Sequence, residues 1–164
     1  MTHALGLFSK ILIYLIASGG ALICAVLFPE LARESIAENP ASTTSTYFFL
    51  AGSYLLFIPF FIGLYFAHKF LGYLGSRYAF TAKPVTALRA IKYCVLIFSV
   101  LVAIEAAAMI VTLKSNTPSE DVTHLIVLAG VTVFTSTTIA LSIAVLQRLF
   151  QDAINIKEEN DLIV

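Results

Sequence analysis

The sequence predicts an all-helical membrane protein with four transmembrane spans. Hydrophobic residues make up 59% of the 164 residues, and charged residues make up only 12%. A soluble domain of this size carries about 25% charged residues, and one folded core cannot bury so much apolar surface, so a lipid bilayer is the expected solvent. The apolar residues form four long runs. Each is close to the ~20 residues that a helix needs to cross the bilayer, whereas the alternating ~10-residue strands of a membrane barrel are absent.

The four runs are expected to form one integral-membrane domain over residues 1–164. They cover residues 7–28, 47–67, 90–113 and 125–146. A basic and aromatic loop at 68–89 joins the second run to the third, and a tail at 147–164 follows the fourth. Because the connections are short, sequential helices should be antiparallel neighbours in a four-helix transmembrane bundle.

The lysine and arginine residues predict the orientation of the bundle. Eight of the ten basic residues fall on one side of the predicted spans, namely Lys10, Lys69, Arg77, Lys83, Arg89, Lys92, Arg148 and Lys157. Only Arg33 and Lys114 fall on the other side. The positive-inside rule then places both termini and the 68–89 loop in the cytoplasm.

Prolines bear on the structure of the first half of the chain at Pro29, Pro40 and Pro59. Pro29–Glu38 is predicted to be a short helix outside the first span, because proline and acidic residues suit a first helical turn, and Asn39-Pro40 should end it. We expect a solvated collar there, and the alternative is an outward sensor for a cation or a peptide. Pro59 lies near the middle of the second span and predicts a kink, while its role as a hinge stays open.

The fourth span is predicted to continue well beyond the membrane. Thr117 and Glu120 have the spacing of a capping box, with Pro118 at the first helical position. A helix from Pro118 to Glu158 would be ~60 Å long, about twice the thickness of the hydrocarbon layer.

The part of this helix beyond the apolar run is amphipathic. One face carries Leu146, Leu149, Phe150, Ala153 and Ile154. Such a stripe needs a cover, which can be the aromatic middle loop, the lipid headgroups, a second copy or a soluble protein. Headgroups are the least favoured cover, since nearby acids such as Asp152 and Glu158 would meet an anionic leaflet.

Glu105 is an acid inside the third predicted span. An ionisable group in lipid is costly, and it is by default a hypothesis of function. The hydroxyls of the fourth span are candidate hydrogen-bond partners: Thr132, Thr135, Ser136, Thr137, Thr138 and Ser142. The functional interpretation is a proton or cation site. The structural alternative is an acid that bonds to a neighbouring helix or reaches the interface.

An enzyme has no support in the sequence. The three histidines and two cysteines lack the spacing of metal ligands, and catalytic and phosphate-binding motifs are absent. We therefore expect no catalytic residue, no metal and no cofactor. A net charge of zero argues against direct binding to nucleic acid.

The positions of the cysteines and of the small residues indicate how the helices can be linked and packed. Cys24 and Cys94 are expected at depths that differ by roughly 15 Å, which is too far for a disulfide. Small residues recur every four positions in several spans, as at Ala17, Ala21 and Ala25. Such faces favour either close packing within the bundle or a homo-oligomer.

Two stretches resemble a known family. Val145–Leu162, with the sequence VLQRLFQDAINIKEENDL, is similar to the C-terminal signature of the YoaS-like family. The members of this family are small four-span bacterial membrane proteins classed as a domain of unknown function. Parts of Ala79–Cys94 resemble the family's middle loop and its entry to the third span. Glu105 is not part of the family pattern.

The resemblance implies a bacterial cytoplasmic membrane and a gene that often neighbours a small helix-turn-helix regulator. It therefore implies a membrane-bound regulatory partner of a transcription factor. We expect the docking residues to be Leu149, Phe150, Ala153, Ile154, Glu158, Glu159, Asn160, Asp161 and Leu162. The alternatives are a small proton- or cation-coupled transporter or channel subunit that uses Glu105, and an assembly subunit without a ligand.

Overall fold

The computed structural model describes residues 2–38, 43–74, 81–113 and 119–161, and nearly all of them are helical. The elements are α1 (Thr2–Leu22), the π-helical turn η1 (Ile23–Leu27), α2 (Phe28–Glu38), α3 (Thr43–Leu74), α4 (Ala82–Leu113) and α5 (Ser119–Asp161). Within these described residues, four helical segments are long and apolar enough to cross a membrane, namely Leu7–Ala37, Thr46–Leu74, Ala82–Val111 and Ile126–Glu159. The prediction of an all-helical chain is confirmed, and the four long apolar helices are consistent with a four-span membrane bundle.

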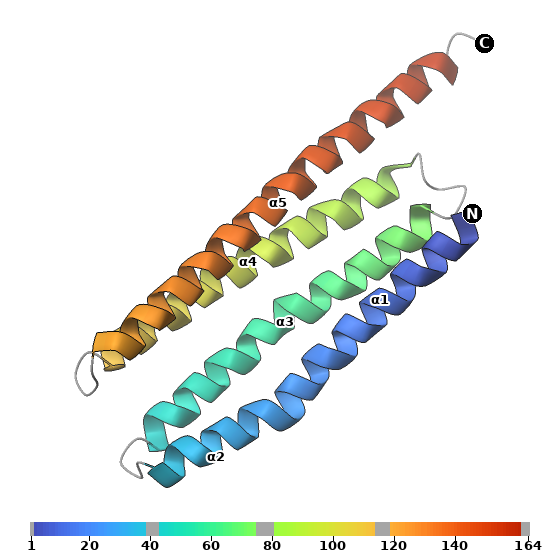
Figure 1. The fold of residues 1–164 in the computed structure, drawn as a ribbon. Helices are drawn as coiled ribbons and strands as arrows, with labels where there is room; N and C mark the ends of the chain where they lie inside the picture. The colour runs from blue at the N-terminus through green and yellow to red at the C-terminus, as the bar shows by residue number, and fades with distance from the viewer. Residues whose placement is uncertain (1, 39–42, 75–80, 114–118, 162–164) are drawn as a thin grey trace.

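The helices pack in the order of the chain. α4 has its densest contacts with α5 and α3, and α3 also contacts α1 and α2. Figure 1 shows the resulting row, in which α1 and α5 form the two edges. Within the described residues, α1 and α5 make no substantial contact with each other. The described helices therefore form an open row rather than a ring, with α4 packed on both sides.

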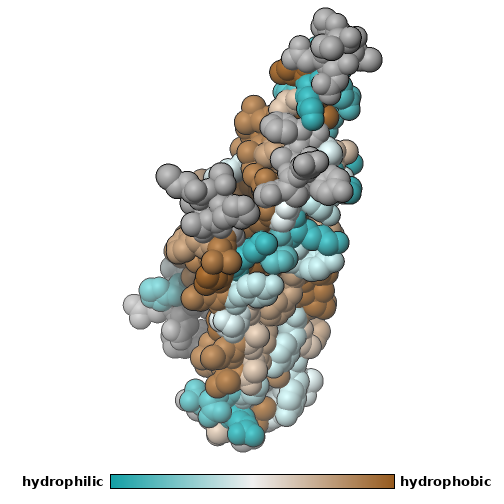
Figure 2. Space-filling view, turned by 90° about the vertical axis from the view of Figure 1, so that its right-hand side faces the viewer, coloured by the Kyte–Doolittle hydropathy of each residue, from teal (hydrophilic) through white to brown (hydrophobic). Residues whose placement is uncertain are grey.

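Large apolar side chains face outward along this row. Phe134, Val111 and Phe48 are 70–75% exposed, and Figure 2 shows broad hydrophobic areas on the face that it draws. Most buried side chains of the described residues are small or β-branched, and two are prolines: Ala32, Pro59, Pro84, Val85, Ala87, Leu88, Ser99, Ser136, Ala140 and Ile154. This distribution suits a protein dissolved in lipid, where exposed apolar groups cost little and small residues let helices approach closely.

The connection predicted between the second and third spans is shorter than expected. The loop predicted at 68–89 is largely helical, because α3 continues to Leu74 and α4 begins at Ala82. The predicted extension of the last helix is confirmed, since α5 runs from Ser119 to Asp161. The capping residues Thr117 and Pro118 lie outside the described residues.

The first helix continues through Pro29, where the sequence predicted that a separate short helix begins. α2 follows η1 without a break, so the helix continues from α1 to Glu38. In η1 the N–H of Phe28 donates to the carbonyl of Ile23, five residues back. An α-helical bond from Phe28 would have reached the carbonyl of Cys24, and Pro29 has no N–H to take its place. The Cys24 carbonyl is therefore left without a donor from its own helix.

The tyrosine of a neighbouring helix satisfies this carbonyl. The Tyr54 hydroxyl on α3 donates to the Cys24 oxygen at 2.8 Å. Phe28 packs edge-on against the rings of Tyr54 and Phe57, with centroids 5.7 and 5.6 Å apart. In lipid no water reaches such a group, so a partner on another helix is the means by which a π-turn persists.

A glycine brings the first helix close to α3 one turn earlier. A Cβ added at Gly20 would lie 2.9 Å from Cε1 of Phe60 and 3.5 Å from Cε1 of Phe57. Gly20 is buried, whereas its neighbour Gly19 is exposed and has open space around it. The contact between α1 and α3 therefore depends on the missing side chain at Gly20.

Candidate functional site

One face of α5 forms a continuous seam that passes beyond the apolar run. Its members alternate at spacings of four and three and are all buried or half-buried: Ala129, Val133, Ser136, Ala140, Ile143, Gln147, Phe150 and Ile154. This spacing is that of two helices packed side by side with a slight left-handed twist. Because α5 has its densest contacts with α4, the seam is the face that α5 turns toward the row.

The seam includes two residues of the candidate docking stripe. Ile154 is only 6% exposed, and Phe150 packs edge-on against Phe70 of α3 with ring centroids 5.8 Å apart. Ala153 is half-buried beside them. Of the covers that the sequence left open, an aromatic residue at the end of α3 is therefore the one found for Phe150.

Leu149 lies on a different face, which is open. Leu149 is 60% exposed and Ile156 is 61% exposed. Asp152 and Glu159 are exposed as well and fall on the same side at helical spacing. We call Leu149, Asp152, Ile156 and Glu159 the acidic-apolar face. Sequence reasoning missed Ile156, although its spacing of seven from Leu149 is the signal that identifies it.

The remaining candidate docking residues stand at the end of α5. Glu158 is exposed. Asn160 and Asp161 form the last turn of the helix, and their side chains lie outside the described residues, as does the whole of Leu162. Figure 1 shows that this end of α5 reaches past the ends of the other helices. A helical surface that no described part of the chain covers is therefore available there.

Glu105 has its partner on α3 rather than on α5. The Ser53 hydroxyl donates to Oε1 of Glu105 at 2.8 Å, and a Cβ added at Gly52 would lie 3.1 Å from the same oxygen. The six hydroxyls of α5 between Thr132 and Ser142 instead donate to carbonyls of their own helix four residues back. Such back-bonding is the usual outcome for a hydroxyl inside a helix. Glu105 is thus a half-buried acid between two spans.

The described residues contain no cluster of side chains that could bind a metal ion and no disulfide between the two cysteines. Cys24 and Cys94 are both free and half-buried. Within the residues described, no three His, Cys, Asp or Glu side chains are grouped so that they could hold a metal ion.

These features define a class of protein, namely a multi-pass helical membrane protein whose last long helix projects beyond the rest of the row. The family described as "Protein of unknown function (DUF2975)" matches residues 30–164, and the chain belongs to this family. It is also 36% identical over 158 residues to the "Uncharacterized membrane protein YoaS" of Bacillus subtilis (strain 168), with 96% of each chain covered. No solved structure gave a significant match. The resemblance inferred from Val145–Leu162 is confirmed.

Proposed function

We propose that this protein is a membrane-bound docking partner for a small cytoplasmic helix-turn-helix regulator. The spans hold the protein in the bacterial cytoplasmic membrane, and the acidic-apolar face of α5 binds the regulator. The observation that carries the proposal is the exposure of Leu149 and Ile156 on a helix that reaches past the others. The role is one of binding, and it assigns the chain no catalytic step and no cofactor.

The orientation of the chain supports this proposal. The start of α1, the end of α3, the start of α4 and the end of α5 lie at the same end of the row (Figure 1). Lys69, Lys83, Arg148 and Lys157 belong to the elements at this end. By the positive-inside rule this end faces the cytoplasm, where a transcription factor is found.

The chemistry of the acidic-apolar face fits such a partner. Leu149 and Ile156 stand two helical turns apart, ~10.5 Å along the axis, which is the spacing of anchors that enter a groove. Asp152 and Glu159 add negative charge beside them. A DNA-binding domain presents a basic surface to the phosphates, so the face and that surface are complementary in charge. Binding would compete with DNA and hold the regulator at the membrane.

Surface substitutions provide the test. Burying a leucine or isoleucine contributes about 1.5–3 kcal/mol, so Leu149→Ser with Ile156→Ser should weaken capture of the neighbouring gene's regulator by more than about tenfold. Gln151→Ala, on another exposed part of the helix, is the matched control and should capture the regulator as the wild type does.

The substitutions are more informative than a chain cut at Leu146, because the cut also removes Phe150 and Ile154, which pack within the chain. Capture by the double variant at the wild-type level would remove the acidic-apolar face from the mechanism.

A second function follows from the Ser53–Glu105 pair. An acid shared between two spans and bonded at 2.8 Å is the kind of group that carries a proton or a cation across a membrane. The alternative proposal is therefore a small transporter or channel subunit. If this proposal is correct, proton flux into liposomes that contain the protein should fall sharply in Glu105→Gln. An absence of proton flux with the wild-type protein would refute the transporter proposal.

A further inference from the structure

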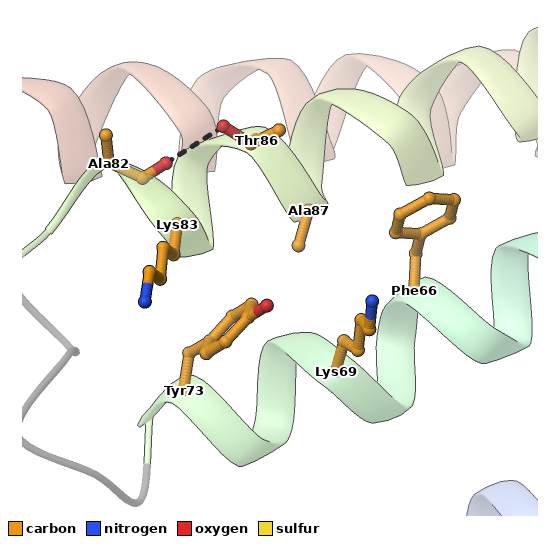
Figure 3. Close-up of a pocket in the computed structure, with 7 residues that line it drawn as sticks. All are labelled: Phe66, Lys69, Tyr73, Ala82, Lys83, Thr86 and Ala87. Atoms are coloured by element: carbon orange, nitrogen blue, oxygen red, sulfur yellow. Dashed lines mark hydrogen bonds between the residues drawn. The ribbon is translucent and has the colours of Figure 1, made fainter.

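A cavity of about 310 Å³ lies between α3 and α4. Its walls include Phe66, Lys69 and Tyr73 from α3, and Lys83 and Ala87 from α4. Figure 3 shows these side chains on both sides of the space between the two helices. The volume falls at the lower end of the range for ligand pockets, so it suits a small polar group rather than a whole lipid.

The charge of this cavity is positive. Lys69 and Lys83 come from opposite walls, and none of the described residues that line the cavity is acidic. The Lys69 ammonium also lies 4.8 Å from the centre of the Tyr65 ring on its own helix, a contact that helps to hold it at the wall. α4 begins at Ala82, another lining residue, so the positive end of a 32-residue helix dipole adds to the charge. Two like charges and a helix N-terminus around one space favour an anion within it.

The cavity is also amphiphilic along its length. Phe66 stands at one end, and Lys83 and Tyr73 stand at the other (Figure 3). Phe66 belongs to the second apolar run, at 47–67, and Lys69 lies two residues beyond the end of that run. The apolar end of the cavity therefore points toward the bilayer core and the basic end toward the headgroups, as in basic pockets that bind anionic lipid headgroups.

We propose that this cavity binds the phosphate group of an anionic phospholipid from the adjacent leaflet. Lys69 and Lys83 contact the phosphate, the Tyr73 hydroxyl is placed to contact the headgroup, and the acyl chains leave past Phe66 into the bilayer. The site is separate from the acidic-apolar face of α5 and does not depend on the regulator.

Native mass spectrometry of the full-length protein tests the proposal. The protein is exchanged into detergent with equal amounts of phosphatidylglycerol and phosphatidylcholine, and the bound lipids are counted. The wild type should retain phosphatidylglycerol in preference to phosphatidylcholine. A lysine near an anionic surface is worth about a fivefold change in binding, so Lys69→Gln and Lys83→Gln should each weaken retention about fivefold, and the double variant about 25-fold.

Lys92→Gln is the matched control. Lys92 is also on α4 and also lies over a tyrosine ring, 5.2 Å from the centre of Tyr93, but it does not line the cavity. The Lys92→Gln variant should therefore retain phosphatidylglycerol as the wild type does. Because Lys69 and Lys83 are exposed, their variants should keep the wild-type circular dichroism spectrum.

Two results would overturn the proposal. The first is unchanged selectivity for phosphatidylglycerol in the double variant. The second is binding of inorganic phosphate by the wild type, lost in the double variant, without any preference between the two lipids. That second result would assign the cavity to a free phosphate instead of a lipid.

Discussion

The hydrogen bond from Tyr54 to Cys24 leads to a specific test of how the first helix passes Pro29. Tyr54→Phe removes the hydroxyl that donates to the Cys24 carbonyl at 2.8 Å. The ring stays, so the edge-on contact with Phe28 at 5.7 Å is retained. The carbonyl then has no donor, because the N–H of Phe28 is bonded to Ile23 and Pro29 has none. The variant therefore isolates one hydrogen bond.

The cost of this change follows from the state of the carbonyl. Leaving a fully buried acceptor without a partner costs about 1–3 kcal/mol, and the Tyr54–Cys24 bond lies on the outer surface of the helix row. Interhelical hydrogen bonds in membrane proteins average about 0.6 kcal/mol and reach about 1.7 kcal/mol. We expect Tyr54→Phe to lower the free energy of unfolding by about 1 kcal/mol. Unfolding in mixed detergent micelles with rising dodecyl sulfate, followed by far-ultraviolet circular dichroism, measures the difference.

Two further variants make this test decisive. Tyr47 lies near the start of the same helix and is 58% exposed. Tyr47→Phe should therefore lower the free energy of unfolding by less than about 0.5 kcal/mol. Pro29→Ala restores an N–H near the Cys24 carbonyl, so it should recover most of the loss when combined with Tyr54→Phe. Equal losses for the two tyrosines, or no recovery by Pro29→Ala, would refute our explanation of the π-turn.

Two more predictions use the same unfolding measurement. Gly20→Leu should cost about 1–3 kcal/mol, because its Cβ would lie 2.9 Å from the Phe60 ring, which must shift out of its packed position. Gly19→Leu, with open space around it, should be nearly neutral, and equal effects would remove Gly20 from the α1–α3 contact. Phe150→Ala should destabilise the protein by at least about 1 kcal/mol through its lost contact with Phe70. Leu149→Ala, at an exposed position, should stay within about 0.5 kcal/mol, and the reverse order would mean that the seam is wrongly assigned.

The composition and the local patterns predicted most of the fold. Four apolar runs of sufficient length predict four long helices, because a membrane span must satisfy its backbone hydrogen bonds within itself. The helical rhythm beyond Leu146 predicts the extension of α5, since amphipathic spacing is a local property of the chain. The stretches Val145–Leu162 and Ala79–Cys94 together indicated the family. None of these inferences requires knowledge of which helices are neighbours.

The residues of the candidate sites depend on tertiary contacts that the sequence does not specify. Periodicity placed Phe150 and Ile154 with Leu149 on one stripe, but the row of helices covers two of them and leaves the third exposed. An apolar stripe in the sequence identifies one face of a helix, but it does not identify the residues that pack against that face. Similarly, Glu105 was expected to bond to hydroxyls of α5, which donate to their own backbone, while Ser53 of α3 provides the actual partner.

The contrast between local pattern and tertiary contact is clearest at Pro29. The sequence by itself determines that the chain is a helical membrane protein with four long apolar segments, because span length and composition are set by the thickness and the dielectric of the bilayer. A proline read locally should begin a new helix at that position. Only the tertiary structure decides that the helix continues, because a hydroxyl from α3 satisfies the carbonyl that the proline cannot. Whether a backbone group in lipid finds a partner depends on which side chains of other helices lie within reach, and only packing sets that.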